Sequence, residues 1–217
     1  MEKEIRQFQI ENLMIEKRED GKPGKISGYA AVFNKRSEDL GWFVEMIASG
    51  AFKNALKKSD ARALVNHDSN LILGRQSAGT LRLKEDAKGL FMEVDLPDTQ
   101  YARDLALSIE RRDIQEQSFG FTVKTDQWQQ NDNEPDLRTL IEIDEIYDVS
   151  PVTFPAYPDT SVAKRSLEAH ANGEDSNSDE SQEDLTDDNP PDSSEDTAKR
   201  NDKTAQLLKR AEALENK

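Results

Sequence analysis

Apolar residues that could build a hydrophobic core become scarce beyond Ser166. Residues 166–217 hold 15 acidic and 6 basic side chains, a net charge of −9, which leaves −6 of the total −15 for residues 1–165. A segment with so little apolar surface cannot offset the conformational entropy that folding costs. We therefore expect a folded body over residues 1–165 and a disordered acidic tail over 166–203. A short amphipathic pattern over 204–217 predicts a C-terminal helix that is too short to be stable without a partner.

Charge and composition exclude several classes of protein. The net negative charge argues against nonspecific nucleic-acid binding, which needs clustered Lys and Arg. The sequence contains no run of about 18 apolar residues, so we expect no membrane-spanning segment. Residues 1–6 are charged and lack the apolar core of a signal peptide. The chain has no cysteine, so disulfides, a thiol nucleophile and Cys-based zinc sites are excluded, which fits a cytosolic protein. We expect no cofactor and no metal, since only two histidines are present.

The body alternates apolar and polar residues over many short segments, which predicts a β-rich domain. Two segments have helical spacing instead: residues 49–56, with Ser49 as the N-cap, and residues 100–112, capped by Asp98 or Thr99. The expected strands are 4–17, 25–33, 42–47, 63–65, 79–84, 89–96, 117–128 and 138–150.

Histidine is scarce, which narrows any chemistry that depends on an imidazole. His170 falls in the acidic tail, where no packed site could hold it. His67 follows the short apolar run 63–65 and precedes Asp68, so we place it at the end of a strand. A polar residue in a surface turn is an equally ordinary explanation. Any histidine-dependent reaction must nevertheless use His67.

A serine lies among aromatic residues in the segment 116–121. If Phe119 and Phe121 face the core, Ser118 and Gly120 face outward together, because side chains alternate along a strand. Gly120 would leave open space beside the hydroxyl. Serines on the polar face of a strand are common, so this pattern alone does not identify a nucleophile.

The loop after this strand predicts which acidic residue lies near the serine. If the hairpin closes around Asn133, paired residue numbers sum to 266 and Ser118 lies opposite Asp148. A hydroxyl nucleophile needs a base, and the base needs an orienting acceptor. His67 and Asp148 are suitable types for those roles, although a solvent-facing acid is the plain alternative for Asp148. A bulge would shift the register and leaves three other candidates: Asp144, Glu145 and Glu142.

Other reaction classes lack their motifs in this sequence. The chain has no P-loop, no dinucleotide-binding glycine fingerprint and no metal-binding His-Glu motif. A hydrolase that uses two carboxylates stays open in so acidic a chain, but no particular pair stands out.

Six short blocks then occur in an order that is typical of a known family. They are GYAAVFN at 28–34, SGAF at 49–52, NHD at 66–68, GL at 89–90, QSFGF at 117–121 and DVSPVTFPAY at 148–157. In these blocks, over roughly residues 5–165, the chain resembles the prohead (capsid maturation) serine proteases of tailed bacteriophages. That family is similar in fold to the assemblin proteases of herpesviruses.

The resemblance implies an α+β fold, with a small, mostly antiparallel β-barrel flanked by helices. It also implies a serine endopeptidase that works inside the immature capsid in the host cytoplasm. Such an enzyme removes scaffold segments from the major capsid protein and then cleaves itself. Carried over to this chain, His67 is the general base, Ser118 the nucleophile and Asp148 the orienting acid. The family pattern does not identify the oxyanion donors in this chain; the Gly120 amide and Arg111 or Arg112 are the candidates that we consider.

Some questions stay open after the resemblance. The acidic tail lies beyond the matching blocks, and either a docking role within the assembling shell or an inert solubilising role fits its composition. Self-association is also open. The alternative to an enzyme is a non-catalytic capsid assembly scaffold that has kept the barrel.

Overall fold

The computed structural model describes residues 3–9, 13–16, 18, 23–40, 43–131 and 134–154. The segments expected as the acidic tail and the C-terminal helix lie outside the described residues. The elements, in chain order, are β1 (Glu4–Gln9), β2 (Met14–Glu16), β3 (Lys25–Val32), β4 (Phe43–Ile47), α1 (Ala55–Lys58), β5 (Arg62–Val65), β6 (Asp68–Arg75), β7 (Leu81–Glu85), β8 (Gly89–Asp95), α2 (Gln100–Glu110), β9 (Glu116–Gln129) and β10 (Asp136–Val152).

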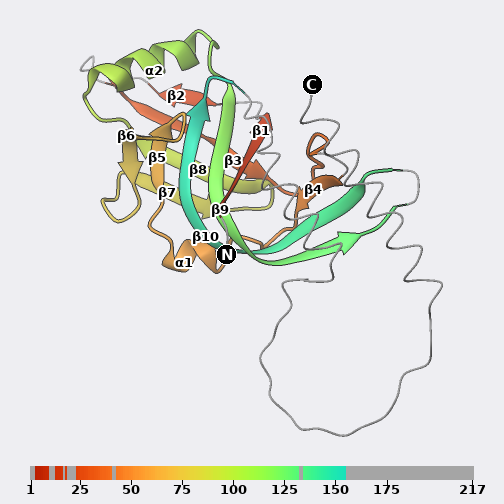
Figure 1. Ribbon diagram of the computed structural model, residues 1–217. Coiled ribbons are helices and arrows are strands. Elements are labelled where there is room, and N and C mark those ends of the chain that lie inside the picture. Colours follow the sequence, from red (N-terminus) through yellow and green to blue (C-terminus); the bar gives the residue numbers. More distant parts are fainter. Residues whose placement is uncertain are drawn as a thin grey trace, which may run out of the picture.

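One sheet is organised around the long hairpin of β9 and β10. Its strand order is β1-β9-β10-β5-β6, and β4 pairs with another stretch of β10. The 17 residues of β10 allow it to pair in parallel with β4 through residues 136–140 and with β5 through residues 148–149. Figure 1 shows β9 and β10 running together along the body and curving away at one end. This sheet therefore gathers strands from both ends of the body.

The second sheet has the strand order β2-β3-β8-β7 and is antiparallel throughout. Its strand β3 contacts both β9 and β1 of the first sheet. The pairing of β3 with β8 shifts register between Tyr29 and Ala31. Next to this shift, Gly89 of β8 lies so close to β3 that an added Cβ would be 2.0 Å from the Ala31 carbonyl oxygen. A side chain at this position would push β8 off β3, so the glycine is required for this pairing.

Aromatic side chains fill the space between the two sheets. The Phe52 ring lies 5.9 Å from that of Phe33 and 5.7 Å from that of Phe119, and Phe119 stacks on Phe121 at 4.5 Å. Three of these residues are fully buried and Phe33 nearly so, and burying each such side chain stabilises the fold by about 1.5–3 kcal/mol. The expected inward direction of Phe119 and Phe121 is confirmed.

A buried cluster of charged residues joins β1, β4, β9 and β10. Arg6 lies 2.8 Å from Glu45 and 2.5 Å from Glu4. Arg138 lies 2.8 Å from Glu4, 3.0 Å from Glu45 and 2.6 Å from Asp126. Burial acts to raise the pKa of Glu4, but the two guanidinium groups outweigh it and hold that pKa below its ordinary value. The cluster fixes β1 to β4, β9 and β10 within the first sheet.

Local structure differs from the sequence prediction at three places. The segment expected as one strand over 4–17 forms β1 and β2, which belong to different sheets. The helix expected over 49–56 is only the single turn α1, because Gly50 adopts a positive φ of 93° and the preceding residues form turns. Ser49 accepts a hydrogen bond from Asn34 and is not the N-cap, which is Asn54. Strand β6 was not predicted.

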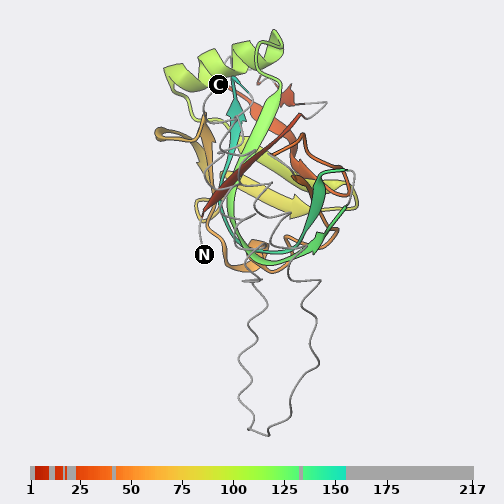
Figure 2. The same ribbon diagram turned by 45° about the vertical axis from the view of Figure 1, so that its right-hand side comes forward.

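The expected sheet-rich, mostly antiparallel α+β body is confirmed, but the expected closed barrel is not seen. The strand pairing of the described residues gives two sheets, and neither closes on itself. Helix α2 begins after Thr99, as predicted, buries Leu105 and Ile109, and covers one end of the body (Figures 1 and 2). Neither α1 nor α2, the helices in the described part of the chain, is long and apolar enough to cross a membrane.

Candidate active site

A two-residue turn between β5 and β6 presents His67. Val65 pairs with Asp68, so the loop consists of Asn66 and His67, whose φ values are 51° and 59°. Positive φ at both positions is typical of the tight turns that match the twist of a hairpin. Two hydrogen bonds join Asn66 to Thr153, which lies just beyond β10. The Asn66 side-chain amide donates to the Thr153 hydroxyl at 3.2 Å, and the Thr153 backbone amide donates to the Asn66 Oδ1 at 2.8 Å. The imidazole is thereby held beside the end of β10.

Ser118 lies in β9 between β1 and β10. Its partners in the ladders are Gln7 on one side and Ser150 on the other. The side chain is fully buried and does not face solvent, contrary to the outward direction expected from strand alternation. The Ser118 Oγ lies 2.7 Å from the His67 Nε2 and 3.1 Å from the carbonyl oxygen of Arg6. The hydroxyl has one proton, so it donates to one of these acceptors at a time.

The β9–β10 register places Asp148 diagonally to Ser118. The predicted sum of 266 holds near the loop, where Trp128 pairs with Arg138, but bulges along β10 raise it to 268. Asp148 therefore pairs with Gly120, and the predicted opposition of Asp148 to Ser118 is wrong by two residues. A shift of two residues keeps side chains on the same face, so Asp148 and Ser118 still project to one side of the sheet.

The Asp148 carboxylate accepts hydrogen bonds on both of its oxygens. Its Oδ1 lies 2.5 Å from the His67 Nδ1 and 2.9 Å from the Ser150 hydroxyl, and its Oδ2 lies 3.0 Å from the Lys3 Nζ. Burial acts to raise the pKa of Asp148, but the contacts with His67 and Lys3 outweigh it and hold the pKa below its ordinary value. An ionised carboxylate favours a proton on Nδ1 and leaves the Nε2 lone pair directed at Ser118.

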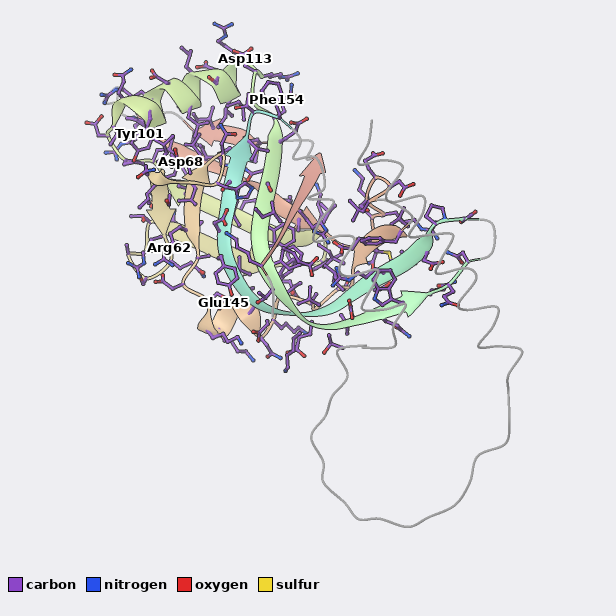
Figure 3. The ribbon with its side chains drawn as sticks, in the orientation of Figure 1. Arg62, Asp68, Tyr101, Asp113, Glu145 and Phe154 are labelled. Atoms are coloured by element: carbon purple, nitrogen blue, oxygen red, sulfur yellow. The ribbon has the colours of Figure 1, made fainter. Side chains whose placement is uncertain are left out.

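The other acidic candidates lie elsewhere on β10. Asp144 forms an ion pair with Lys58, 2.5 Å away, and Glu142 accepts hydrogen bonds from Asn54 and Lys124. Figure 3 shows Glu145 at the end of the body next to α1, far from Asp68, the residue that follows His67. The structure thus brings His67, Ser118 and Asp148 together and separates the three alternatives from them.

Three residues of the site were not predicted from the sequence. Ser150 follows Asp148 by two positions, so strand alternation could have placed both on one face. Lys3 and the Arg6 carbonyl reach the site because β1 pairs with β9. No local signal in the sequence indicates that pairing.

A hydroxyl, an imidazole and a buried carboxylate in series are the groups that nucleophilic acyl transfer requires. Comparison with known proteins agrees with this chemistry. The family model described as the caudovirus prohead serine protease matches residues 11–173. This chain belongs to that family.

One curated protein and one solved structure are similar to this chain. The prohead protease of Enterobacteria phage HK97 is 32% identical over 148 residues, which cover 66% of this chain and 61% of that protein. The match therefore spans less than two thirds of the relative's length. The structure of the bacteriophage T4 capsid assembly protease, gp21, matches with a TM-score of 0.37 and 12% identity, over 69% of this chain and 96% of that one.

Proposed function

We propose that this chain is a serine endopeptidase that cleaves scaffold segments of the major capsid protein, and itself, during prohead maturation. Ser118 is the nucleophile, His67 the general base and Asp148 the acid that orients the base. The observation that carries the proposal is the unbroken series of contacts from Asp148 through the two nitrogens of His67 to the Ser118 hydroxyl. Membership of the prohead serine protease family supports it.

In the proposed reaction the Ser118 Oγ attacks the carbonyl carbon of the scissile peptide bond. Its proton passes to the His67 Nε2, and Asp148 stabilises the imidazolium that forms. The imidazolium then gives this proton to the leaving amine, the C–N bond breaks, and an ester on Ser118 remains. Water, deprotonated by the same imidazole, hydrolyses the ester and restores the hydroxyl.

A substrate peptide cannot reach the Ser118 hydroxyl in this structure. Ser118 is fully buried, and the Arg6 carbonyl competes with His67 for its proton. The scissile carbonyl carbon must come within about 3–3.5 Å of the Oγ for attack. Peptide binding must therefore move the residues that cover Ser118.

Several finer points belong to this proposal. The enzyme acts on the major capsid protein inside the prohead, in the host cytoplasm; the name of the HK97 relative, prohead protease, supports the prohead as its setting. Its catalytic domain covers residues 1–165, and its acidic tail either docks it in the shell or keeps it in solution. Self-association is part of the same proposal. Gly120 and Arg111 or Arg112 remain the candidate oxyanion donors.

The burial of Ser118 favours a second candidate, a capsid assembly scaffold without catalysis. The two functions differ in what they do to covalent bonds. Co-expression of the full chain with the capsid protein of the same phage, followed by intact mass measurement, separates them. The protease shortens the capsid protein at one defined bond and produces a truncated form of itself. Capsid protein that keeps its full mass, in shells that require this chain, supports the scaffold.

A further inference from the structure

The second oxygen of Asp148 is held by a cation from the far end of the sequence. The Lys3 Nζ donates a hydrogen bond to Oδ2 at 3.0 Å. The first oxygen, Oδ1, receives His67 at 2.5 Å and the Ser150 hydroxyl at 2.9 Å. The two oxygens therefore have different partners, and only Oδ1 faces the imidazole.

Asp148 needs a cation because its side chain is only 3% exposed. A carboxylate removed from water is costly to ionise unless a positive charge or hydrogen-bond donors stabilise it. The Lys3 side chain is 46% exposed, so its ammonium group keeps water contacts while it reaches the carboxylate. This arrangement stabilises the buried charge without the penalty of burying two ions.

The neighbouring strand leaves room for this contact. A Cβ added to Gly120 would lie 2.6 Å from the Asp148 Oδ2 and 2.6 Å from the Lys3 Cε. The Lys3 Nζ also lies 5.5 Å from the centre of the Tyr147 ring, within the range of a cation–π interaction. Gly120 thus provides the slot in which the ammonium and the carboxylate meet, and Tyr147 flanks it.

We propose that Lys3 is a positioning residue of this site, whose ammonium keeps the Asp148 carboxylate ionised and turned so that Oδ1 faces His67. The inference deepens the proposed protease function and rests on it. Without the ammonium, the carboxylate is free to rotate about its Cβ–Cγ bond toward other donors. The His67 Nδ1 then loses its fixed acceptor, and the Nε2 lone pair is no longer held toward Ser118.

Two readouts on the full chain test this role. The first is the ¹⁵N spectrum of histidine-labelled protein, recorded at an alkaline pH where it no longer changes with pH, with His170→Gln used to assign the signals of His67. It reports which nitrogen of His67 carries the proton. The second is the rate at which co-expressed capsid protein is processed. The variants are Lys3→Met, Lys3→Arg as the charge-preserving rescue, and Lys58→Met as the control.

We expect wild type and Lys3→Arg to show His67 protonated on Nδ1, and Lys3→Met to show a mixture of both tautomers. Processing should fall about 10- to 100-fold in Lys3→Met, the value of one hydrogen bond to a charged group, and recover in Lys3→Arg. Lys58→Met removes the Lys–Asp pair at Asp144, on the same strand, and should change neither readout.

Three results would contradict the role of Lys3. One is a wild-type tautomer in Lys3→Met, another is unchanged processing by that variant, and the third is a Lys3→Arg variant as impaired as Lys3→Met. If the wild-type chain processes no capsid protein, the proposed protease function fails instead. The tautomer of His67 in Lys3→Met then still shows whether Lys3 keeps Asp148 oriented toward His67.

Discussion

Asp148 and Ser118 lie on neighbouring strands, on one face of the sheet, and diagonally to each other rather than opposite. Asp148 pairs with Gly120, and Ser118 pairs with Ser150. Diagonal neighbours on two strands are about 7–8 Å apart, whereas opposite residues are about 4.5–5.5 Å apart. The diagonal spacing leaves room for an imidazole ring, and His67 fills it, with contacts of 2.5 Å and 2.7 Å at its two nitrogens.

Replacement of the carboxylate tests the role of Asp148. Asp148→Asn keeps the size of the side chain, but its amide cannot stabilise an imidazolium and favours the wrong tautomer of His67. We expect the rate of capsid processing to fall about 10³- to 10⁴-fold. Asp144→Asn, on the same strand and paired with Lys58, is the matched control and should keep the wild-type rate. A near-normal rate for Asp148→Asn moves the orienting role to another residue.

The turn that presents His67 is expected to store strain. His67 has a φ of 59°, a region that costs a residue with a Cβ about 1–2 kcal/mol but is open to glycine. Both His67→Gly and His67→Ala remove the imidazole, so their difference isolates the backbone. We expect His67→Gly to be more stable than His67→Ala by about 1 kcal/mol in urea unfolding. Equal stability of the two variants would argue against a strained turn.

The buried ionic cluster should be sensitive to the loss of Arg138. Its guanidinium contacts Glu4, Glu45 and Asp126, and its removal leaves the buried Glu4 and Glu45 with the charge of Arg6 alone within the cluster. We expect Arg138→Met to lower the free energy of unfolding by about 3–5 kcal/mol. Arg82→Met removes a comparable but exposed network and should cost no more than about 1 kcal/mol. Similar losses in the two variants would contradict the importance of burial.

The depressed pKa of Asp148 predicts how stability depends on pH. Folding favours the ionised form, so Asp148 contributes stability that is fully present above its ordinary pKa of 3.8 and is lost as the pH falls through the lower folded value. The free energy of unfolding, measured in urea, should be larger for wild type than for Asp148→Asn at about pH 5. This difference should shrink as the pH falls toward about 2. Titrating groups that do not contact Asp148 are common to both proteins and cancel in the difference. A constant difference over this range would refute the predicted shift.

Local patterns in the sequence were sufficient to predict the β9–β10 hairpin and α2. The scarcity of histidine singled out His67, and the hairpin register placed Asp148 near Ser118, although two residues away from the pairing that the structure shows. These inferences depend on residues within one element or one hairpin. They succeed because hydrophobic periodicity and turn chemistry are local properties.

Non-local pairing accounts for what the sequence did not reveal. Strand β10 pairs in parallel with β4 and β5, and no turn signal specifies such a pairing. The bulges that shift Asp148 by two residues depend on how β10 bends within the sheet. Lys3 meets Asp148 only because β1 lies along β9, and the burial of Ser118 likewise depends on the assembled sheet.

Substitution of the nucleophile is the decisive measurement. The full chain carrying Ser118→Ala is co-expressed with the capsid protein, and the intact masses of both proteins are compared with wild type. Ser108→Ala, which changes a half-buried serine of α2 whose hydroxyl donates to the Asp104 carbonyl, is the control. We predict that Ser118→Ala unfolds like wild type and leaves both proteins at full mass, while Ser108→Ala processes them normally. Capsid protein shortened at the wild-type rate by Ser118→Ala would contradict Ser118 as the nucleophile.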